Sequence, residues 1–142
     1  LKINLPKAPD PVGSYVASKI IGNLVYISGQ LPLNQEGKLI KGKIGKDLSL
    51  EQGRDSAKLC ALNLLAQLKK LIGSLDKVKS CIKITGYVNS TDFFIDQPKV
   101  INGASDLISQ IFGDKGKHAR AAVSVNSLPL GASVEIDAIF EI

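Results

Sequence analysis

The sequence contains few of the side chains that build metal centres and nucleic-acid surfaces. It has two cysteines and one histidine among 142 residues, and no metal-ligand spacing surrounds Cys60 or Cys81. Three tyrosines and four phenylalanines are few for stacking on bases, the lysines are scattered, and no recognised nucleic-acid motif occurs. The net charge of +5 therefore does not by itself indicate a nucleic-acid partner. We predict no metal site, no nucleic-acid partner and two buried, reduced thiols.

Long apolar runs are also missing. No stretch approaches the ~20 apolar residues that cross a bilayer, and residues 1–11 are polar and interrupted by proline, unlike a signal peptide. A chain of 142 residues with 44% hydrophobic content is long enough for one compact domain and too short for two ordinary ones. We expect a single domain over residues 1–142 in a soluble, cytoplasmic protein without a membrane partner.

The apolar patterns that are present predict two strands, a helix, a strand, a second helix and two closing strands. The first strands flank Gly22-Asn23, which suits a tight hairpin turn. Ser49 and Gln52 form a capping box that opens the first helix, and Gly73 ends it. The remaining elements are a strand near residues 82–88, a helix opened by Asp96 and Pro98 that ends at Gly113, and strands at 119–125 and 132–142. Residues 34–47 are polar and lysine-rich, and predict an extended surface loop.

This order predicts an α+β fold, with a mixed sheet and both helices packed on one face. The opposite face then has no cover within the chain. In so small a domain, another subunit is the simplest way to bury it.

Arg120 is the most informative single residue. Only it and Arg54 carry guanidinium groups among 18 basic side chains, and residues 118–125 read His-Ala-Arg-Ala-Ala-Val-Ser-Val. A planar, permanently charged fork between small residues suits a carboxylate, which it can hold by two parallel hydrogen bonds.

Strand alternation suggests a partner for Arg120. If Ala121, Val123 and Val125 face the helices, Arg120 lies on the open face, and so does Glu135 of the last strand. A hairpin between the two closing strands then sets Arg120 directly opposite Glu135, with the Cβ atoms ~5 Å apart. An ordinary cross-strand ion pair is the structural alternative to a functional site.

Several short motifs occur in a specific order and spacing. They are Gly13-Ser14-Tyr15, residues 22–32 (GNLVYISGQLP), Val78-Lys79, Ala119-Arg120, Leu128-Pro129 and Val134-Glu135-Ile136. Together they resemble the YjgF/RidA family, also called the endoribonuclease L-PSP or chorismate-mutase-like family, over nearly the whole chain.

The resemblance implies a chorismate-mutase-like ββαβαββ fold and a homotrimer whose free sheet faces form a central barrel, with clefts between subunits that bind small carboxylates. Better-studied members hydrolyse reactive enamines and imines, such as 2-aminoacrylate and 2-iminopropionate, to a 2-keto acid and ammonia. No metal or organic cofactor takes part. By resemblance, Arg120 clamps the substrate carboxylate and Glu135 positions the attacking water. The residues expected to bind substrate are Tyr15, Gly29, Asn102, Ala121 and Ala122.

The chain departs from short family members in ways that leave its substrate open. Where those read Pro-Ala-Arg-Ser-Cys, residues 118–122 read His-Ala-Arg-Ala-Ala, so a hydroxyl and a thiol are missing, and the loop at 34–47 is longer. Gly29 can equally be a strand-end turn residue, and Tyr15 can pack against a neighbouring subunit. We expect the His118 side chain to point away from Arg120 and to have a structural or loop role, although a histidine can also act as an acid or base.

Three other functions remain open at this point. A trimer of the same architecture can bind or sense small carboxylates without turnover. A ribonuclease is suggested by the family's older name, but no catalytic His/Lys arrangement is recognisable in the sequence. A chorismate-type isomerase rests on fold analogy alone.

Overall fold

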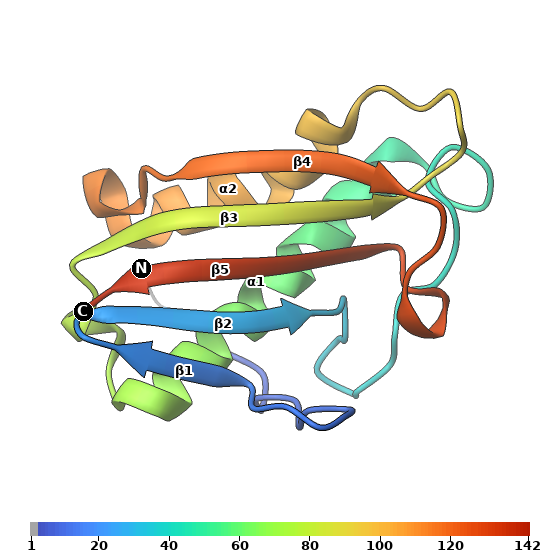
Figure 1. Cartoon of the computed structure of the whole chain (residues 1–142). Helices are drawn as coiled ribbons and strands as arrows, with labels where there is room; N and C mark the ends of the chain where they lie inside the picture. Colours follow the sequence, from blue (N-terminus) through green and yellow to red (C-terminus); the bar gives the residue numbers. More distant parts are fainter. Residues whose placement is uncertain (1–2) are drawn as a thin grey trace.

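The computed structural model describes residues 3–142 and shows a five-stranded sheet with both long helices on one face (Figure 1). The elements follow the order β1 (Ser18–Ile21), β2 (Leu24–Gln30), α1 (Leu50–Ile72), η1 (Leu75–Lys77), β3 (Ser80–Asn89), α2 (Gln97–Phe112), η2 (Gly113–Gly116), β4 (Ala119–Val125), η3 (Pro129–Gly131) and β5 (Val134–Glu141). This confirms the predicted α+β class and element order.

The local signals in the sequence act as predicted at the first turn and the first helix. Gly22 has φ +58° in the two-residue turn between β1 and β2. At the start of α1 the Ser49 side chain accepts from the Gln52 amide, and the Gln52 side chain accepts from the Ser49 amide, which is a complete capping box. Gly73 ends α1 with φ +87°.

The strand order is β1-β2-β5-β3-β4, and the predicted hairpin between the two closing strands is wrong. β4 pairs with β3 in parallel, whereas β5 lies between β2 and β3 and is antiparallel to both. Two strands joined by a helix such as α2 run parallel, so β3, α2 and β4 form one βαβ unit with β4 at the sheet edge. The core-facing residues of β5, Val134, Ile136, Ala138 and Phe140, are almost fully buried, which suits a central strand.

The two helices approach closely at one glycine. α1 lies behind β5 and β2, and α2 behind β3 and β4 (Figure 1). A methyl group on Gly103 of α2 would overlap the Arg54 carbonyl of α1, so the helices can approach this closely only without a side chain at position 103. The contact sets how closely α1 and α2 lie at this point. Cys60 and Cys81 are free and buried, as predicted, and burial raises the pKa of Cys81 to about 12.

The segment at 34–47 is more closely tied to the fold than the predicted surface loop. Ile44 is fully buried in the core. The Lys43 ammonium donates to Asn89 Oδ1 at 3.0 Å and to the Asn126 carbonyl at 2.6 Å, so the loop is pinned to the ends of β3 and β4. The prediction of a surface loop followed the polar composition of the segment and overlooked Ile44, its one fully buried apolar residue.

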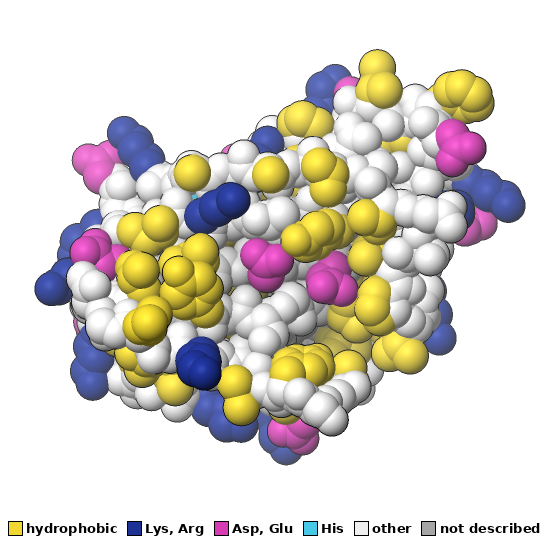
Figure 2. All heavy atoms as spheres, in the orientation of Figure 1, with side chains coloured by type: hydrophobic (Ala, Val, Ile, Leu, Met, Phe, Trp, Pro, Cys, Tyr) yellow, Lys and Arg dark blue, Asp and Glu magenta, His cyan; other side chains and the backbone are white. Residues whose placement is uncertain are grey.

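The sheet face opposite the helices carries apolar side chains around two acidic ones (Figure 2). Tyr26 is 47% exposed and Val123 is 45% exposed. Both lie on this open face with half-buried Ile139 and with Glu135 and Asp137 of β5. Within the described residues, no helix is long and apolar enough to cross a membrane.

Candidate functional site

Arg120 lies at the start of the edge strand and is held by α2. Its Nη1 donates to Asn102 Oδ1 at 2.7 Å and to Ser105 Oγ at 3.1 Å. Its Nη2 donates to the Pro98 carbonyl at 3.4 Å. The side chain is half-buried, and within residues 3–142 it makes no salt bridge with a carboxylate. We call Arg120, Asn102, Ser105 and Pro98 the arginine site.

The face predicted for Arg120 is therefore wrong. Arg120, Ala122 and Ser124 point toward the helices, whereas Ala121 and Val123 lie on the open face. Alternation divides a strand into two sets of side chains, but it does not say which set faces the helices. On an edge strand the inward set need not be apolar, because α2 supplies polar partners such as Asn102.

The guanidinium keeps one binding edge. A guanidinium has five N–H groups, and three are used by Asn102, Ser105 and Pro98. Within the described residues no hydrogen bond from Nε is found, and Nη2 retains one hydrogen. Nε–H and this Nη2–H remain as donors for the two oxygens of a carboxylate. The arginine site is thus a cation without a countercharge in its own chain, prepared for an anion.

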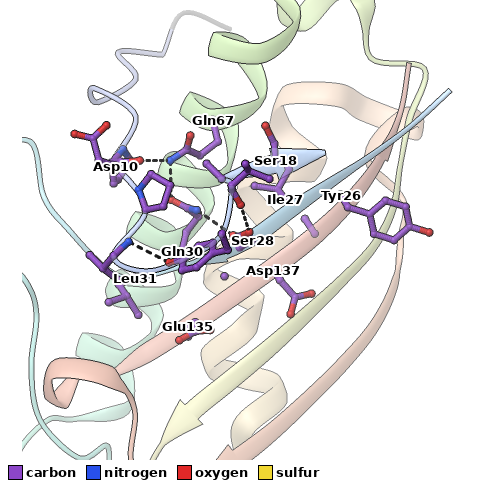
Figure 3. A pocket seen from close by; sticks show the side chains of 18 of the residues that line it. Asp10, Ser18, Tyr26, Ile27, Ser28, Gln30, Leu31, Gln67, Glu135 and Asp137 are labelled. Carbon is purple, nitrogen blue, oxygen red and sulfur yellow. Dashed lines mark hydrogen bonds between the residues drawn. The ribbon is translucent and has the colours of Figure 1, made fainter. Parts of the chain in front are cut away.

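Glu135 belongs to a second cluster on the open face. It lies beside Tyr87 of β3 in the sheet register, and two residues further along β5 Asp137 accepts from the Tyr87 hydroxyl at 3.2 Å. A cavity of about 880 Å³ borders these carboxylates and is also lined by Tyr15 and Gly29 (Figure 3). We call Glu135, Asp137, Tyr87, Gly29 and Tyr15 the glutamate site.

Gly29 and Tyr15 shape this cavity in different ways. A methyl group on Gly29 would overlap the Glu135 carboxylate, so glycine leaves the room that the acid occupies. Tyr15 is 49% exposed, and its hydroxyl accepts from the Val12 amide at 3.3 Å. Gly29 is therefore more than a turn residue, and Tyr15 lines the cavity beside it.

The carboxyl groups of the glutamate site are poised to hold protons more tightly than usual. Burial, and then the charge of Asp137, raise the pKa of Glu135. Burial also raises the pKa of Asp137, opposed by the Tyr87 hydrogen bond and the charge of Lys83. A glutamate with a raised pKa is a better proton acceptor near neutral pH than an ordinary surface glutamate.

The arginine and glutamate sites do not meet within one chain. Arg120 pairs with Ile84 of β3, whereas Glu135 pairs with Tyr87 on the other side of β3. A whole strand separates the two residues, and their side chains leave opposite faces of the sheet. The expected direct pairing of Arg120 with Glu135 is therefore wrong, because it assumed the hairpin that the structure lacks.

Sequence analysis missed several members of these clusters. Ser105 lies three residues after Asn102, the spacing that places two side chains on one helix face, so its contact with Arg120 was predictable once Asn102 was chosen. Asp137 shares the strand parity of Glu135. Within residues 3–142, no three or more histidine, cysteine or acidic side chains gather as metal ligands.

His118 also lies elsewhere than expected. Its Nε2 is 2.9 Å from Ser105 Oγ, and its Nδ1 is 2.6 Å from the Gly116 carbonyl oxygen. The side chain thus points to the same side as Arg120. Residues two apart in an extended chain share a face, so the expectation that His118 points away was wrong.

Comparison with known proteins decides the family. The family described as "YjgF/chorismate_mutase-like, putative endoribonuclease" matches residues 1–141. The chain belongs to the YjgF/chorismate-mutase-like family. Protein TCP17 of Trypanosoma cruzi is 43% identical over 143 residues, covering 100% of this chain and 89% of that protein.

Two further proteins are similar to this member of the YjgF/chorismate-mutase-like family, one in fold and one in sequence. The crystal structure of Atu1372 from Agrobacterium tumefaciens superposes with a TM-score of 0.88 at 50% identity, covering 94% of this chain and 85% of that chain. The 2-iminobutanoate/2-iminopropanoate deaminase of Dermatophagoides farinae is 30% identical, covering 96% of this chain and 92% of that protein.

The family motifs coincide with the two sites. Residues 22–32 include β2 and carry Gly29, and Val134-Glu135-Ile136 opens β5. Ala119-Arg120 opens β4. The short motifs on which the sequence resemblance rests thus present the arginine and the glutamate.

Proposed function

We propose that this protein hydrolyses small imino and enamino acids of the 2-iminopropionate type to a 2-keto acid and ammonia. The observation that carries the proposal is the half-buried Arg120 guanidinium, held on one side by α2 and free on the edge that fits a carboxylate. The deaminase named among the relatives supports the same substrate class. Each charge-assisted hydrogen bond to the carboxylate contributes about 1.5 to 3 kcal/mol.

We further propose that a complete site forms between subunits of a homotrimer. The arginine site lies at the sheet edge and the glutamate site on the open sheet face, so one chain cannot apply both to one small molecule. The arginine site of one subunit facing the glutamate site of its neighbour supplies both halves. Packing the open faces together also buries apolar side chains such as Tyr26 and Val123.

The reaction needs positioning more than special reactivity, because imines already hydrolyse in water. Arg120 holds the substrate carboxylate, and Glu135 accepts a proton as water adds to the imine carbon. The imine nitrogen takes up a proton to give a carbinolamine. Glu135 then returns its proton to the amino group, the carbinolamine hydroxyl loses its proton to water as the C–N bond breaks, and ammonia and the 2-keto acid are released. Hydrolysis is complete with water as the only co-reactant.

The deciding experiment measures keto-acid formation from 2-iminopropionate generated in solution by oxidation of alanine. We expect the protein to accelerate hydrolysis above the uncatalysed rate in proportion to its concentration. Saturable pyruvate binding without any acceleration would instead identify a non-catalytic carboxylate-binding trimer. If neither binding nor turnover is found, the proposal is wrong.

The pH dependence of turnover reports the environment of Glu135. As a base, Glu135 must be ionised, so kcat/KM should fall as pH drops through its raised pKa. The negative charge of Asp137 is one cause of that raised pKa, so Asp137→Asn should move this acidic limb to lower pH. Full pH profiles of kcat/KM for the parent and Asp137→Asn test this. A limb that stays in place, or moves to higher pH, contradicts the assignment of Glu135 as the base.

Gly29→Ala should disturb the glutamate site with little effect on folding. The added methyl group meets the mobile end of the Glu135 side chain, so the carboxylate is displaced rather than the backbone. We expect kcat/KM to fall by about 10- to 100-fold from the misplaced base. The double variant Gly29→Ala/Glu135→Gln serves as the control and should be no slower than Glu135→Gln alone. Additive losses would show that Gly29 acts through another route.

A further inference from the structure

The strongest unexplained feature is a continuous chain of hydrogen bonds that ends on Arg120. It starts at the Gly116 carbonyl, passes through both ring nitrogens of His118 and reaches Ser105 Oγ. Arg120 Nη1 then donates to the same Ser105 oxygen at 3.1 Å. All three side chains are half-buried, and the proposed reaction assigns no task to His118 or Ser105.

The direction of each hydrogen bond follows from the first one. A carbonyl oxygen only accepts, so His118 Nδ1 carries the proton that points to Gly116. In the neutral imidazole Nε2 is then an acceptor, and the Ser105 hydroxyl donates to it. This turns the Ser105 lone pairs toward Arg120. The histidine thus fixes the hydroxyl rotor with its hydrogen on His118, which leaves the oxygen lone pairs free to accept from the guanidinium.

Ser105 is one of the two acceptors that orient Arg120 Nη1. Asn102 Oδ1 accepts one Nη1 hydrogen, and Ser105 Oγ accepts the other. With both hydrogens engaged, the plane of the guanidinium is set, and so is the direction of its free Nε/Nη2 edge. Without Ser105, the group is held only by Asn102 and by the long 3.4 Å hydrogen bond from Nη2 to the Pro98 carbonyl, so it has more freedom to turn.

We propose that His118 and Ser105 are positioning residues that hold the carboxylate-binding edge of Arg120 in place. The consequence for catalysis rests on the proposed function. The consequence for the orientation of Arg120 does not.

Three variants separate this role from general packing. An asparagine amide at position 118 reaches the place of Nδ1 and can keep the Gly116 contact but not Ser105. A glutamine amide reaches the place of Nε2 and can keep Ser105. His118→Asn and Ser105→Ala should therefore disturb Arg120, whereas His118→Gln should preserve it.

The first readout is the arginine side-chain NMR signal, which needs no turnover. The chain has only two arginines, so Arg54→Lys assigns the Nε–H resonance of Arg120 by elimination. We expect a rigid Arg120 Nε–H in the parent and in His118→Gln, and a mobile one in His118→Asn and Ser105→Ala. An Arg120 signal that is equally rigid in all four proteins would overturn the proposal.

The second readout is the comparison of KM with kcat, which separates substrate binding from the chemical step. The clamp holds the carboxylate in substrate and transition state alike, so we expect KM to rise about tenfold in His118→Asn and Ser105→Ala, with kcat changed less than about twofold. The double variant should be no worse than either single one, because both act through one route. If the parent is active and KM is the same in His118→Asn and Ser105→Ala as in the parent, the proposed role in catalysis is wrong. If the parent is inactive but Arg120 becomes mobile in the two variants, the proposed deaminase activity is wrong, whereas the positioning role of His118 and Ser105 is supported.

Discussion

Arg120→Ala should lower kcat/KM for 2-iminopropionate by about 100-fold or more. Removing the fork removes two charge-assisted hydrogen bonds to the carboxylate, each contributing about 1.5 to 3 kcal/mol. Arg120→Lys keeps the charge but not the planar geometry, and should remain at least about tenfold below the parent. Steady-state rates of keto-acid formation at equal protein concentration measure both losses.

The other arginine provides the matched control. Arg54 donates to the Lys99 carbonyl at 3.0 Å and to Asp106 at 3.3 Å, and it shares no hydrogen-bond partner with Arg120. Arg54→Lys should keep kcat/KM within about twofold of the parent, since one exposed ion pair contributes little to stability. Thermal unfolding of each variant separates lost binding from lost fold. A fully active Arg120→Ala would remove the clamp from the mechanism.

Mixing two inactive variants should restore activity if the catalytic site joins two chains. Arg120→Ala retains an intact glutamate site, and Glu135→Gln retains an intact arginine site. In randomly reassembled oligomers of equal proportions, about one site in four receives the parental arginine from one chain and the parental glutamate from its neighbour. We expect about a quarter of the parental rate after unfolding and refolding the two variants together.

The controls for this experiment are the same variants refolded separately and then combined without exchange. These should stay inactive. When the double variant Arg120→Ala/Glu135→Gln is refolded with the parent, the rate of keto-acid formation should not exceed the rate that the parental chains give by themselves. Failure of the two single variants to complement, despite proven exchange of subunits, would show that the arginine and the glutamate of one site do not come from neighbouring chains.

Sequence reasoning predicted what is local and missed what is topological. The capping box at Ser49, the Gly22 turn and the inward parity of Phe140 depend on neighbours along the chain, and all three are as expected. The place of β5 between β2 and β3 depends on competition among strands for the most buried position. That competition is decided by the whole sheet, so pairing the two closing strands by proximity in sequence failed.

The same distinction explains the candidate site. Arg120 stood out because guanidinium groups are rare in this lysine-rich chain, and Asn102 was chosen by resemblance; the structure brings them within 2.7 Å. The face of Arg120 was missed because an edge strand relaxes the usual rule that inward side chains are apolar. His118 was missed through a misapplied alternation, which the sequence alone sufficed to correct.

The position of β4 at the sheet border has a consequence for handling the protein. Its outer backbone groups have no partner strand within residues 3–142, and residues 119–125 carry a single charged side chain, that of Arg120. An edge strand of small and apolar residues is prone to pair with the edge of another molecule and aggregate, and the positive charge of Arg120 opposes this pairing. Neutralising Arg120 thus also removes a gatekeeper, and the alanine variant should precipitate at concentrations that the lysine variant tolerates.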